Sequence, residues 1–342
     1  MTCIRSFRLG AVSVLAASML FLSGCSASNA TQGADGGVTD IEIAVTQWPS
    51  LVFSVPYHVA MEKGFFKKVG INVTGVITTQ GGGTDVRAIL AGNLAFGEAA
   101  TSAVANAYLQ GAPLKIVGAG VQAVGDIVWV APKDSSLNSV KDVSGHSASY
   151  TNPGSVTQSV LALSLDRAGI DVKQVEMKAT GGVGEGISAM EAGGVDSAIW
   201  SEPLFSAAPD KYKLLWRASD LIPEYQQTVI VTSPDLVKKN PTLVRNFLKA
   251  RAEGLQYMID HPDEAGEIWA ERGKIDPAAA KSAIQALLAA NEWGVGFSGP
   301  GLTTAEEGMH IAGVLKPKDT VPWSDFLTQD FLPKGVDKIS LP

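Results

Sequence analysis

Hydroxyl side chains begin two of the helices that the sequence predicts. One helix starts at Thr101-Ser102, and the other starts at Ser155-Val156-Thr157. The first amides of a helix have no acceptor within the helix, and the helix dipole makes this end positive. A hydroxyl beside such amides adds a further donor, so a site of this kind can bind an anion without arginine. These residues are therefore candidate ligands for a small anionic solute.

Three aromatic side chains, Trp48, Tyr57 and Trp200, could form apolar walls around such a solute. Two acidic residues, Asp126 and Glu202, complicate this hypothesis, because a carboxylate that faced a sulfonate would repel it. Either these two carboxylates point elsewhere, or the solute also carries an amine or a ring N–H.

Gln47 and Gly82 are further candidates, because each lies in a loop that follows a predicted strand. The strand at 41–45 is followed by Thr46-Gln47-Trp48-Pro49, and the strand at 71–78 is followed by the glycine-rich loop 80–83. In open α/β sheets, ligands bind beside loops at the carboxyl ends of strands.

Strands alternate with helices along the chain, which predicts an α/β fold with a parallel or mixed sheet. Four strands precede residue 121, and the pattern restarts at Ile127, which indicates a second lobe. The strands are expected at 41–45, 71–78, 94–97, 115–120, 127–131, 148–150, 172–179, 195–200, 212–217 and 228–232. Helices are expected within 56–63, from Thr84 or Asp85 to 91, from Thr101-Ser102 to 109, at 156–168, at 184–191 and throughout the region after Pro241.

Five phrases of the sequence resemble one family. The segment 56–73 (PYHVAMEKGFFKKVGINV) resembles a signature of solute-binding proteins from ABC importers of the nitrate, sulfonate and taurine type. The remaining similar phrases lie at 92–102, at 140–146, where His146 replaces the usual lysine, at 195–203 and at 240–265. The resemblance covers roughly residues 40 to 331.

This resemblance implies a two-lobed, periplasmic-binding-protein-like fold of type II. Each lobe would be a mixed sheet flanked by helices, and two crossover segments would join the lobes. Lobe 1 would comprise 39–124 and 233–342, and lobe 2 would comprise 125–232. The two hydroxyl-bearing helix ends would then face each other across the cleft. The protein would be a monomer that closes by hinge motion on a solute and presents it to ABC permease subunits.

The amino terminus resembles a bacterial lipoprotein signal. Arg5 and Arg8 precede an apolar run, Leu9 to Leu22, that is too short to span a bilayer comfortably, and Cys25 follows. We predict a signal peptide at 1–24, lipidation of Cys25 and a flexible tether at 25–38. The protein would be exported and anchored on the outer face of the cell membrane, or be periplasmic. Its mature chain would keep no thiol for a disulfide.

Charge argues against a nucleic-acid partner. The formal charge is −7, becoming −9 once both signal arginines are removed, and no basic stripe is present to displace counterions from phosphates.

Motifs for catalysis, metals and cofactors are missing from the sequence. The four histidines fall in different predicted elements without metal-ligand spacing, and no nucleophile motif is present. Gly118-x-Gly120-x-x-Ala123 matches a dinucleotide fingerprint, but a strand follows it instead of the required helix. We interpret Gly118, Gly120 and Gly125 as pivots of a crossover between lobes. No cofactor, metal or catalytic residue is predicted.

Three alternatives remain open. The same fold could bind a thiamine-precursor pyrimidine or an aromatic acid, with Trp48 and Trp200 stacking and Asp126 or Glu202 accepting ring N–H bonds. It could also be an enzyme, as in related pyrimidine synthases and small-molecule lyases, or an exported sensor module without a permease.

Overall fold

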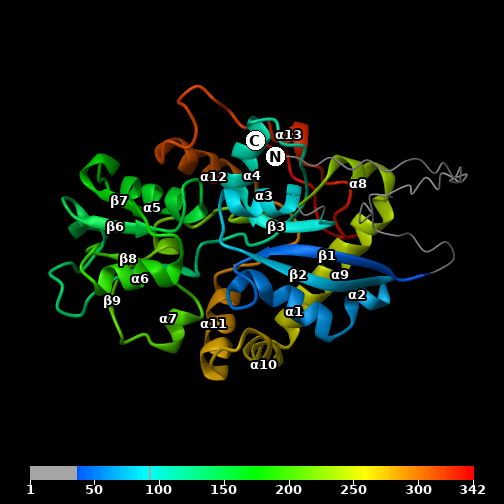
Figure 1. Ribbon diagram of the computed structural model, residues 1–342, viewed down its shortest axis with the longest axis horizontal. Coiled ribbons are helices and arrows are strands. Elements are labelled where there is room, and N and C mark those ends of the chain that lie inside the picture. The colour runs from blue at the N-terminus through cyan, green and yellow to red at the C-terminus, as the bar shows by residue number, and fades with distance from the viewer. Residues whose placement is uncertain (1–36, 92–93) are drawn as a thin grey trace, which may run out of the picture.

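The computed structural model describes residues 37–91 and 94–342, which form two lobes joined by two crossover segments (Figure 1). The predicted signal peptide, Cys25 and the tether up to residue 36 lie outside the described residues. This arrangement is the two-lobed α/β architecture that the sequence predicted.

Lobe 1 is built on a five-stranded mixed sheet in the order β2-β1-β3-β10-β4. Strands β1, β2 and β3 run parallel, and β10 is antiparallel to β3 and β4. The strands are β1 (Thr39–Thr46), β2 (Ile71–Thr79), β3 (Phe96–Ala100), β4 (Lys115–Ala119) and β10 (Thr228–Thr232).

Helices cover both faces of this sheet because its strands bury side chains on both sides. Helices α3 and α4 pack on one face, and α1, α2 and α9 pack on the other (Figure 1). Their bounds are α1 (Val55–Glu62), α2 (Phe65–Lys68), α3 (Gly83–Ala91), α4 (Thr101–Leu109) and α9 (Pro241–Asp260), and a 3-10 turn, η1 (Val52–Ser54), precedes α1.

Lobe 2 repeats the same plan. Strands β8, β5 and β9 form an antiparallel sheet, and β6 pairs in parallel with β7. Ser149 donates its amide to Ser197, which joins β6 to β8 and makes the order β7-β6-β8-β5-β9. The elements are β5 (Ile127–Ala131), β6 (Ser147–Tyr150), α5 (Val156–Arg167), β7 (Glu176–Ala179), α6 (Val183–Glu191), β8 (Ala198–Ser201), α7 (Leu204–Ala207) and β9 (Lys213–Arg217), with 3-10 turns at Val140–Val143, Val172–Gln174 and Ala218–Asp220.

The two crossover segments are residues 120–126, between β4 and β5, and residues 221–227, between the turn after β9 and β10. They bind each other, since the amides of Gln227 and Thr228 both donate to the Val121 carbonyl at 2.9 and 3.0 Å. Residues 228–232 form β10 in the sheet of lobe 1. The return to lobe 1 thus begins before residue 232, where the expected boundary stood, because β10 completes the hydrogen bonds of β3 and β4.

The crossover glycines serve close packing. At Gly120 a Cβ would collide with the side chains of Glu98 and Thr228, and at Gly125 it would lie 2.8 Å from Glu292 Oε2. Neither glycine has a positive φ, so the backbone does not need glycine for its conformation. The close neighbours of Gly120 and Gly125 thus explain why these two positions of the crossover need glycine, and their role as pivots stays a prediction.

The carboxyl-terminal helices bridge the lobes. Helix α11 contacts α7, and α12 packs on α5, where Gly308 faces Leu163 (Figure 1). The helices after β10, of which α11 and α12 make these contacts with lobe 2, are α8 (Pro234–Lys239), α9, α10 (Pro262–Gly273), α11 (Pro277–Ala289), α12 (Gly299–Ile311) and α13 (Trp323–Phe326). In the described ranges, no helix has both the length and the apolar character needed to cross a membrane.

A buried ion pair ties α9 to the sheet of lobe 1. Arg251 Nη2 lies 3.1 Å from Glu98 Oε2, and the Tyr57 hydroxyl donates to the same oxygen at 2.8 Å. Burial, and then the Glu98 charge, hold the pKa of Tyr57 well above its usual range. Tyr57 is therefore a neutral donor to the buried Glu98 carboxylate.

We predict that Arg251→Ala lowers the free energy of unfolding by about 3–5 kcal/mol, because it leaves the Glu98 carboxylate buried without its cation. Lys249→Ala, at an exposed position on the same helix, should change it by less than about 0.5 kcal/mol. Chemical denaturation of both variants measures this difference. Equal stability of the two variants would show that the ion pair does not anchor α9.

Candidate functional site

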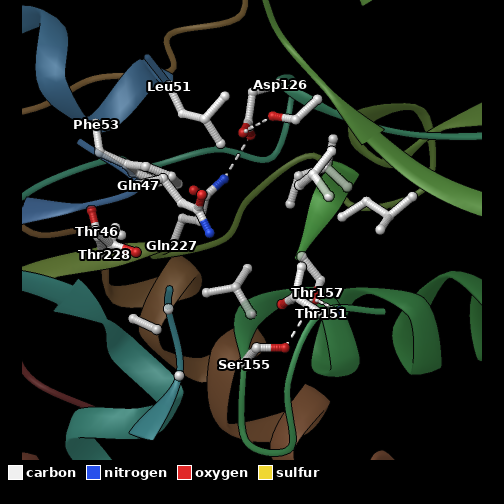
Figure 2. A pocket seen from close by; sticks show the side chains of 18 of the residues that line it. Thr46, Gln47, Leu51, Phe53, Asp126, Thr151, Ser155, Thr157, Gln227 and Thr228 are labelled. Atoms are coloured by element: carbon white, nitrogen blue, oxygen red, sulfur yellow. Dashed lines mark hydrogen bonds between the residues drawn. The ribbon is translucent and has the colours of Figure 1, made fainter. Parts of the chain in front are cut away.

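A pocket lies between the lobes, beside the crossovers, and contains about 500 Å³ of space not filled by protein atoms (Figure 2). Lobe 1, lobe 2 and the crossovers all contribute to its lining, which consists of Thr46, Gln47, Leu51, Phe53, Gln80, Gly81, Gly82, Ala100, Asp126, Ile127, Thr151, Ser155, Val156, Thr157, Val183, Ile199, Ser201, Gln227 and Thr228.

The start of α5 supplies a hydroxyl cluster from lobe 2. Ser155 is the N-cap of this helix, and its Oγ accepts the Gln158 amide at 3.2 Å. Thr157 Oγ1 lies 2.9 Å from Ser155 Oγ and 2.8 Å from Thr151 Oγ1, and it accepts the Thr151 amide (Figure 2). Ser155, Val156 and Thr157 therefore lie where we predicted them, at a helix end that faces a pocket.

Lobe 1 supplies Gln47, Phe53 and the loop 80–82. Phe53 comes from the 3-10 turn η1, and its ring forms the aromatic wall of the pocket (Figure 2). The loop is held from below by the buried Asp85, whose Oδ1 accepts the Gly81 amide at 3.0 Å. Burial raises the pKa of Asp85 to about 6. Asp85 therefore lies in the first turn of α3 and fixes the position of the pocket loop.

The crossovers supply Asp126, Gln227 and Thr228. Asp126 Oδ1 accepts a hydrogen bond from Gln227 Nε2 at 2.7 Å, and Asp126 Oδ2 accepts one from the Ser201 hydroxyl at 3.1 Å (Figure 2). Burial raises the pKa of Asp126, although these hydrogen bonds oppose the shift. Among the described residues, Asp126 is the one charged side chain that lines the pocket.

The other predicted helix end lies beside the pocket without lining it. Thr101 is fully buried, and its amide donates to the Gln227 carbonyl at 3.1 Å. Ser102 Oγ donates to the Gly154 carbonyl of lobe 2 at 3.0 Å, and Asn152 Nδ2 donates to the Gln80 carbonyl of lobe 1 at 3.1 Å. The α4 end therefore holds the lobes together at this edge, and only Ala100, just before it, reaches the pocket.

Three predicted aromatic walls are turned away from the pocket. The Trp48 ring lies 4.1 Å from the His58 ring, and Tyr57 belongs to the buried Glu98 cluster. Trp200 packs edge-on against Tyr212 and Phe205, on the α6 side of the lobe 2 sheet. The three residues were therefore wrongly predicted as pocket walls. For Trp200 the reason is that successive strand residues point to opposite faces, and Ile199 takes the pocket side. Trp48 and Tyr57 contact His58 and Glu98 instead.

Glu202 also lies outside the lining. Its carboxylate accepts the Ser206 amide at 3.0 Å and is 3.6 Å from Arg217 Nη2. The two predicted carboxylates are thus separated in role, since Asp126 faces the pocket and Glu202 faces Arg217.

Several lining residues escaped sequence reasoning, chiefly Phe53, Thr151, Gln227 and Ser201. Thr151 and Ser201 each end a strand region beside a predicted site residue, so the strand-end rule that selected Gln47 could have found them. Phe53 and Gln227 carried no such signal. In the ranges that the structure covers, no group of three His, Cys, Asp or Glu side chains could hold a metal ion.

The fold and this pocket define the class, a two-lobed α/β protein with a pocket between its lobes. A sequence model described as NMT1/THI5 like matches residues 53–265, which is more than half of the chain, and the chain belongs to this family.

Two curated relatives match most of the chain. It is 25% identical over 267 residues to the formylaminopyrimidine-binding protein of Halalkalibacterium halodurans, covering 76% of this chain and 77% of the relative. It is 26% identical over 319 residues to the riboflavin-binding protein RibY of Chloroflexus aurantiacus, covering 86% of each chain.

Solved structures share the fold at lower identity. The alkanesulfonate-binding protein SsuA from Xanthomonas axonopodis pv. citri, bound to MOPS, has a TM-score of 0.71 and 15% identity, covering 85% of this chain and 98% of that one. The desulfurization enzyme DSZB has a TM-score of 0.60 and 13% identity, covering 85% of this chain and 97% of that one. Both binding proteins and an enzyme therefore use this fold.

We predict that Asn152→Ala shifts the protein toward a more open arrangement of its lobes, because it removes the hydrogen bond to Gln80 across the cleft. One such bond contributes about 0.5–1.5 kcal/mol, so the open-to-closed ratio should rise about twofold to tenfold. Small-angle X-ray scattering measures this as a larger radius of gyration. Asn138→Ala, whose side chain binds only within lobe 2, should leave the scattering unchanged. Identical curves for both variants would contradict the prediction.

Proposed function

We propose that this chain is the solute-binding protein of an ABC importer and that its solute is a small nitrogen heterocycle with a ring N–H or amino group. The observation that carries the proposal is the pocket's charge. Its one charged side chain, among the described residues, is the carboxylate of Asp126, which accepts N–H bonds and repels anions. This reading favours the pyrimidine alternative over the sulfonate or nitrate that we placed first.

Family membership supports the transport role, and the relatives that bind a formylaminopyrimidine and riboflavin support the solute class. In this proposal the solute's ring stacks on Phe53, its N–H group donates to Asp126, and Gln47 and Gln227 supply further polar contacts. Lobe 2 contributes the hydroxyl cluster at α5. Because these groups come from both lobes, a complete set of contacts exists only when the lobes are closed, and solute binding favours the closed form.

A small anion is the second candidate, and the start of α5 favours it. The helix dipole and the hydroxyls of Thr151, Ser155 and Thr157 face the pocket there. An anion bound at this end would have to keep its charge away from Asp126.

Thermal unfolding of the purified protein separates the two candidates. The panel is 4-amino-2-methylpyrimidine, riboflavin, taurine, methanesulfonate and nitrate. A solute at about one hundred times its Kd stabilises the folded state by about 2.7 kcal/mol, which raises Tm by several degrees. We expect a shift with the pyrimidine and none with nitrate or methanesulfonate. A shift with the anions alone would overturn the heterocycle assignment. Recovery of the solute unchanged after incubation would argue against an enzyme.

We predict that Phe53→Ala weakens binding of 4-amino-2-methylpyrimidine about tenfold, because stacking of a base on an aromatic ring contributes about 1–3 kcal/mol. Trp200→Phe is the matched control, since its ring packs outside the pocket, and its Kd should equal that of the wild type. Isothermal titration calorimetry measures both values. A larger loss in the Trp200 variant would place the ring elsewhere.

We also propose export and lipid attachment at Cys25, with the protein acting as a monomer beside its permease. Cys25→Ser should release the protein from membranes into the soluble fraction of broken cells, because the anchored thiol is missing. Cys3→Ser should stay with the membranes, because Cys3 leaves with the signal peptide. Membrane fractionation and mass spectrometry of the mature amino terminus test this. Equal fractionation of the two variants would contradict lipidation of Cys25.

A further inference from the structure

Two buried carboxyl groups meet where the first crossover passes the carboxyl-terminal part of lobe 1. Asp126 ends this crossover, and Glu292 follows α11, and the two side chains are only 1% and 0% exposed. The segment around Glu292 is bound to the crossover, since the Gln122 amide donates to the Glu292 carbonyl at 2.6 Å and Val121 bridges Trp293. Backbone pairing between the two segments therefore brings the two carboxyl groups close to each other.

Hydrogen bonds account for three of the four carboxyl oxygens. Glu292 Oε2 accepts the Gly125 amide at 2.9 Å, while Gln227 and Ser201 donate to the two oxygens of Asp126. In the described part of the chain, Glu292 Oε1 has no donor. The Glu292 carboxyl is nevertheless held next to Asp126 by the amide of the preceding residue, Gly125, so the two carboxyl groups can form a hydrogen bond with each other. Two carboxyl groups can form that bond only if one of them carries a proton.

Neighbouring charges do not remove the need for this proton. Glu202 adds a further negative charge beside Asp126, and the Arg217 guanidinium binds Glu202 and the Gly125 carbonyl. Arg251, which reaches the Gly294 carbonyl, is paired with Glu98 on the other side of this segment. Two ionised carboxylates would therefore repel each other strongly, because burial keeps away the water that would screen their charges. Burial, and then the Asp126 charge, raise the pKa of Glu292 well above its usual range.

We propose that Glu292 keeps its proton and donates a hydrogen bond to Asp126, so that Asp126 stays an ionised and fixed acceptor for an N–H group of the solute. Glu292 is then a positioning residue, since it acts on the solute only through Asp126. The ligand part of this inference rests on the proposed function. A carboxylate has about four acceptor positions, and three donors occupy Asp126, which leaves one for the solute. Loss of the Glu292 proton at high pH would create a repelling pair and weaken binding of an uncharged solute.

The shared proton can be tested without any ligand. Because folded Glu292 holds its proton more tightly than the unfolded chain does, the contribution of Glu292 to folding stability falls as pH rises above the ordinary glutamate value of 4.5. One retained proton changes the folding equilibrium tenfold per pH unit until Glu292 ionises. Glu292→Gln cannot ionise, so its free energy of unfolding should lack this decrease, and the slopes of the two proteins against pH should differ by one proton. Glu271→Gln, at an exposed position on α10, should follow the wild type.

Chemical denaturation of the wild type and both variants over a pH series tests whether Glu292 keeps its proton in the folded state. Equal slopes for the wild type and Glu292→Gln would overturn the proposal. If Glu292→Gln fails to fold, infrared spectroscopy of the wild type gives the same decision. A carbonyl stretch of a protonated carboxylic acid at neutral pH, whose frequency changes in Asp126→Asn because Glu292 loses its carboxylate acceptor, supports the proposal. No such band in the wild type overturns it.

Calorimetry with 4-amino-2-methylpyrimidine, over a pH range in which the probe itself does not titrate, tests the consequence for binding. The wild type should lose affinity as pH rises, Glu292→Gln should bind with a constant affinity near the wild-type maximum, and Asp126→Asn should bind at least tenfold more weakly. Parallel pH profiles for the wild type and Glu292→Gln would overturn the positioning role. No binding by the wild type would count against the proposed solute. The pH dependence of unfolding without ligand would still test whether Glu292 keeps its proton.

Discussion

Satisfaction of buried polar groups in the two crossovers is the constraint on which the rest of the structure depends. Both segments run through the interior between lobes, where an unpaired amide or carbonyl costs free energy. They therefore bind each other, through the Gln227 and Thr228 amides on Val121 and the Gly120 amide on Thr228. This pairing sets the position of each sheet, and it leaves space for glycine alone beside Glu98.

The pocket takes its charge from this same link. Asp126, Gln227 and Thr228 belong to the crossovers, while the lobes contribute a ring from Phe53 and hydroxyls at the start of α5. A site of this composition offers one fixed acceptor with a negative charge and many neutral donors. Its selectivity would therefore come from the hydrogen-bonding pattern of the solute, because an uncharged analogue without the N–H would leave the remaining acceptor position of Asp126 desolvated and without a donor.

The fold is shared by proteins with different activities, so it does not decide the function by itself. Structures similar to this one include a sulfonate-binding protein and a desulfurization enzyme. The described lining of the pocket has a carboxylate and no cation side chain, which supports the heterocycle that we propose over a small anion. Contacts from both lobes, with Ser102 and Asn152 joining them at the edge, suit a protein that closes around its ligand.

The sequence by itself determined the α/β class, the two lobes and the family, because strand–helix alternation and the phrase at 56–73 are local patterns. Local patterns also located Ser155, Thr157 and Gln47, which follow strand ends or begin a helix. Only the tertiary structure decided that Asp126 faces the pocket while Glu202 faces Arg217, and that Trp200 points away from it. Which face a residue takes depends on strand register, and the meeting of Asp126 with Glu292 depends on packing between segments more than 160 residues apart. Neither is encoded in the neighbouring sequence, because both arise from contacts that form only when the whole chain has folded.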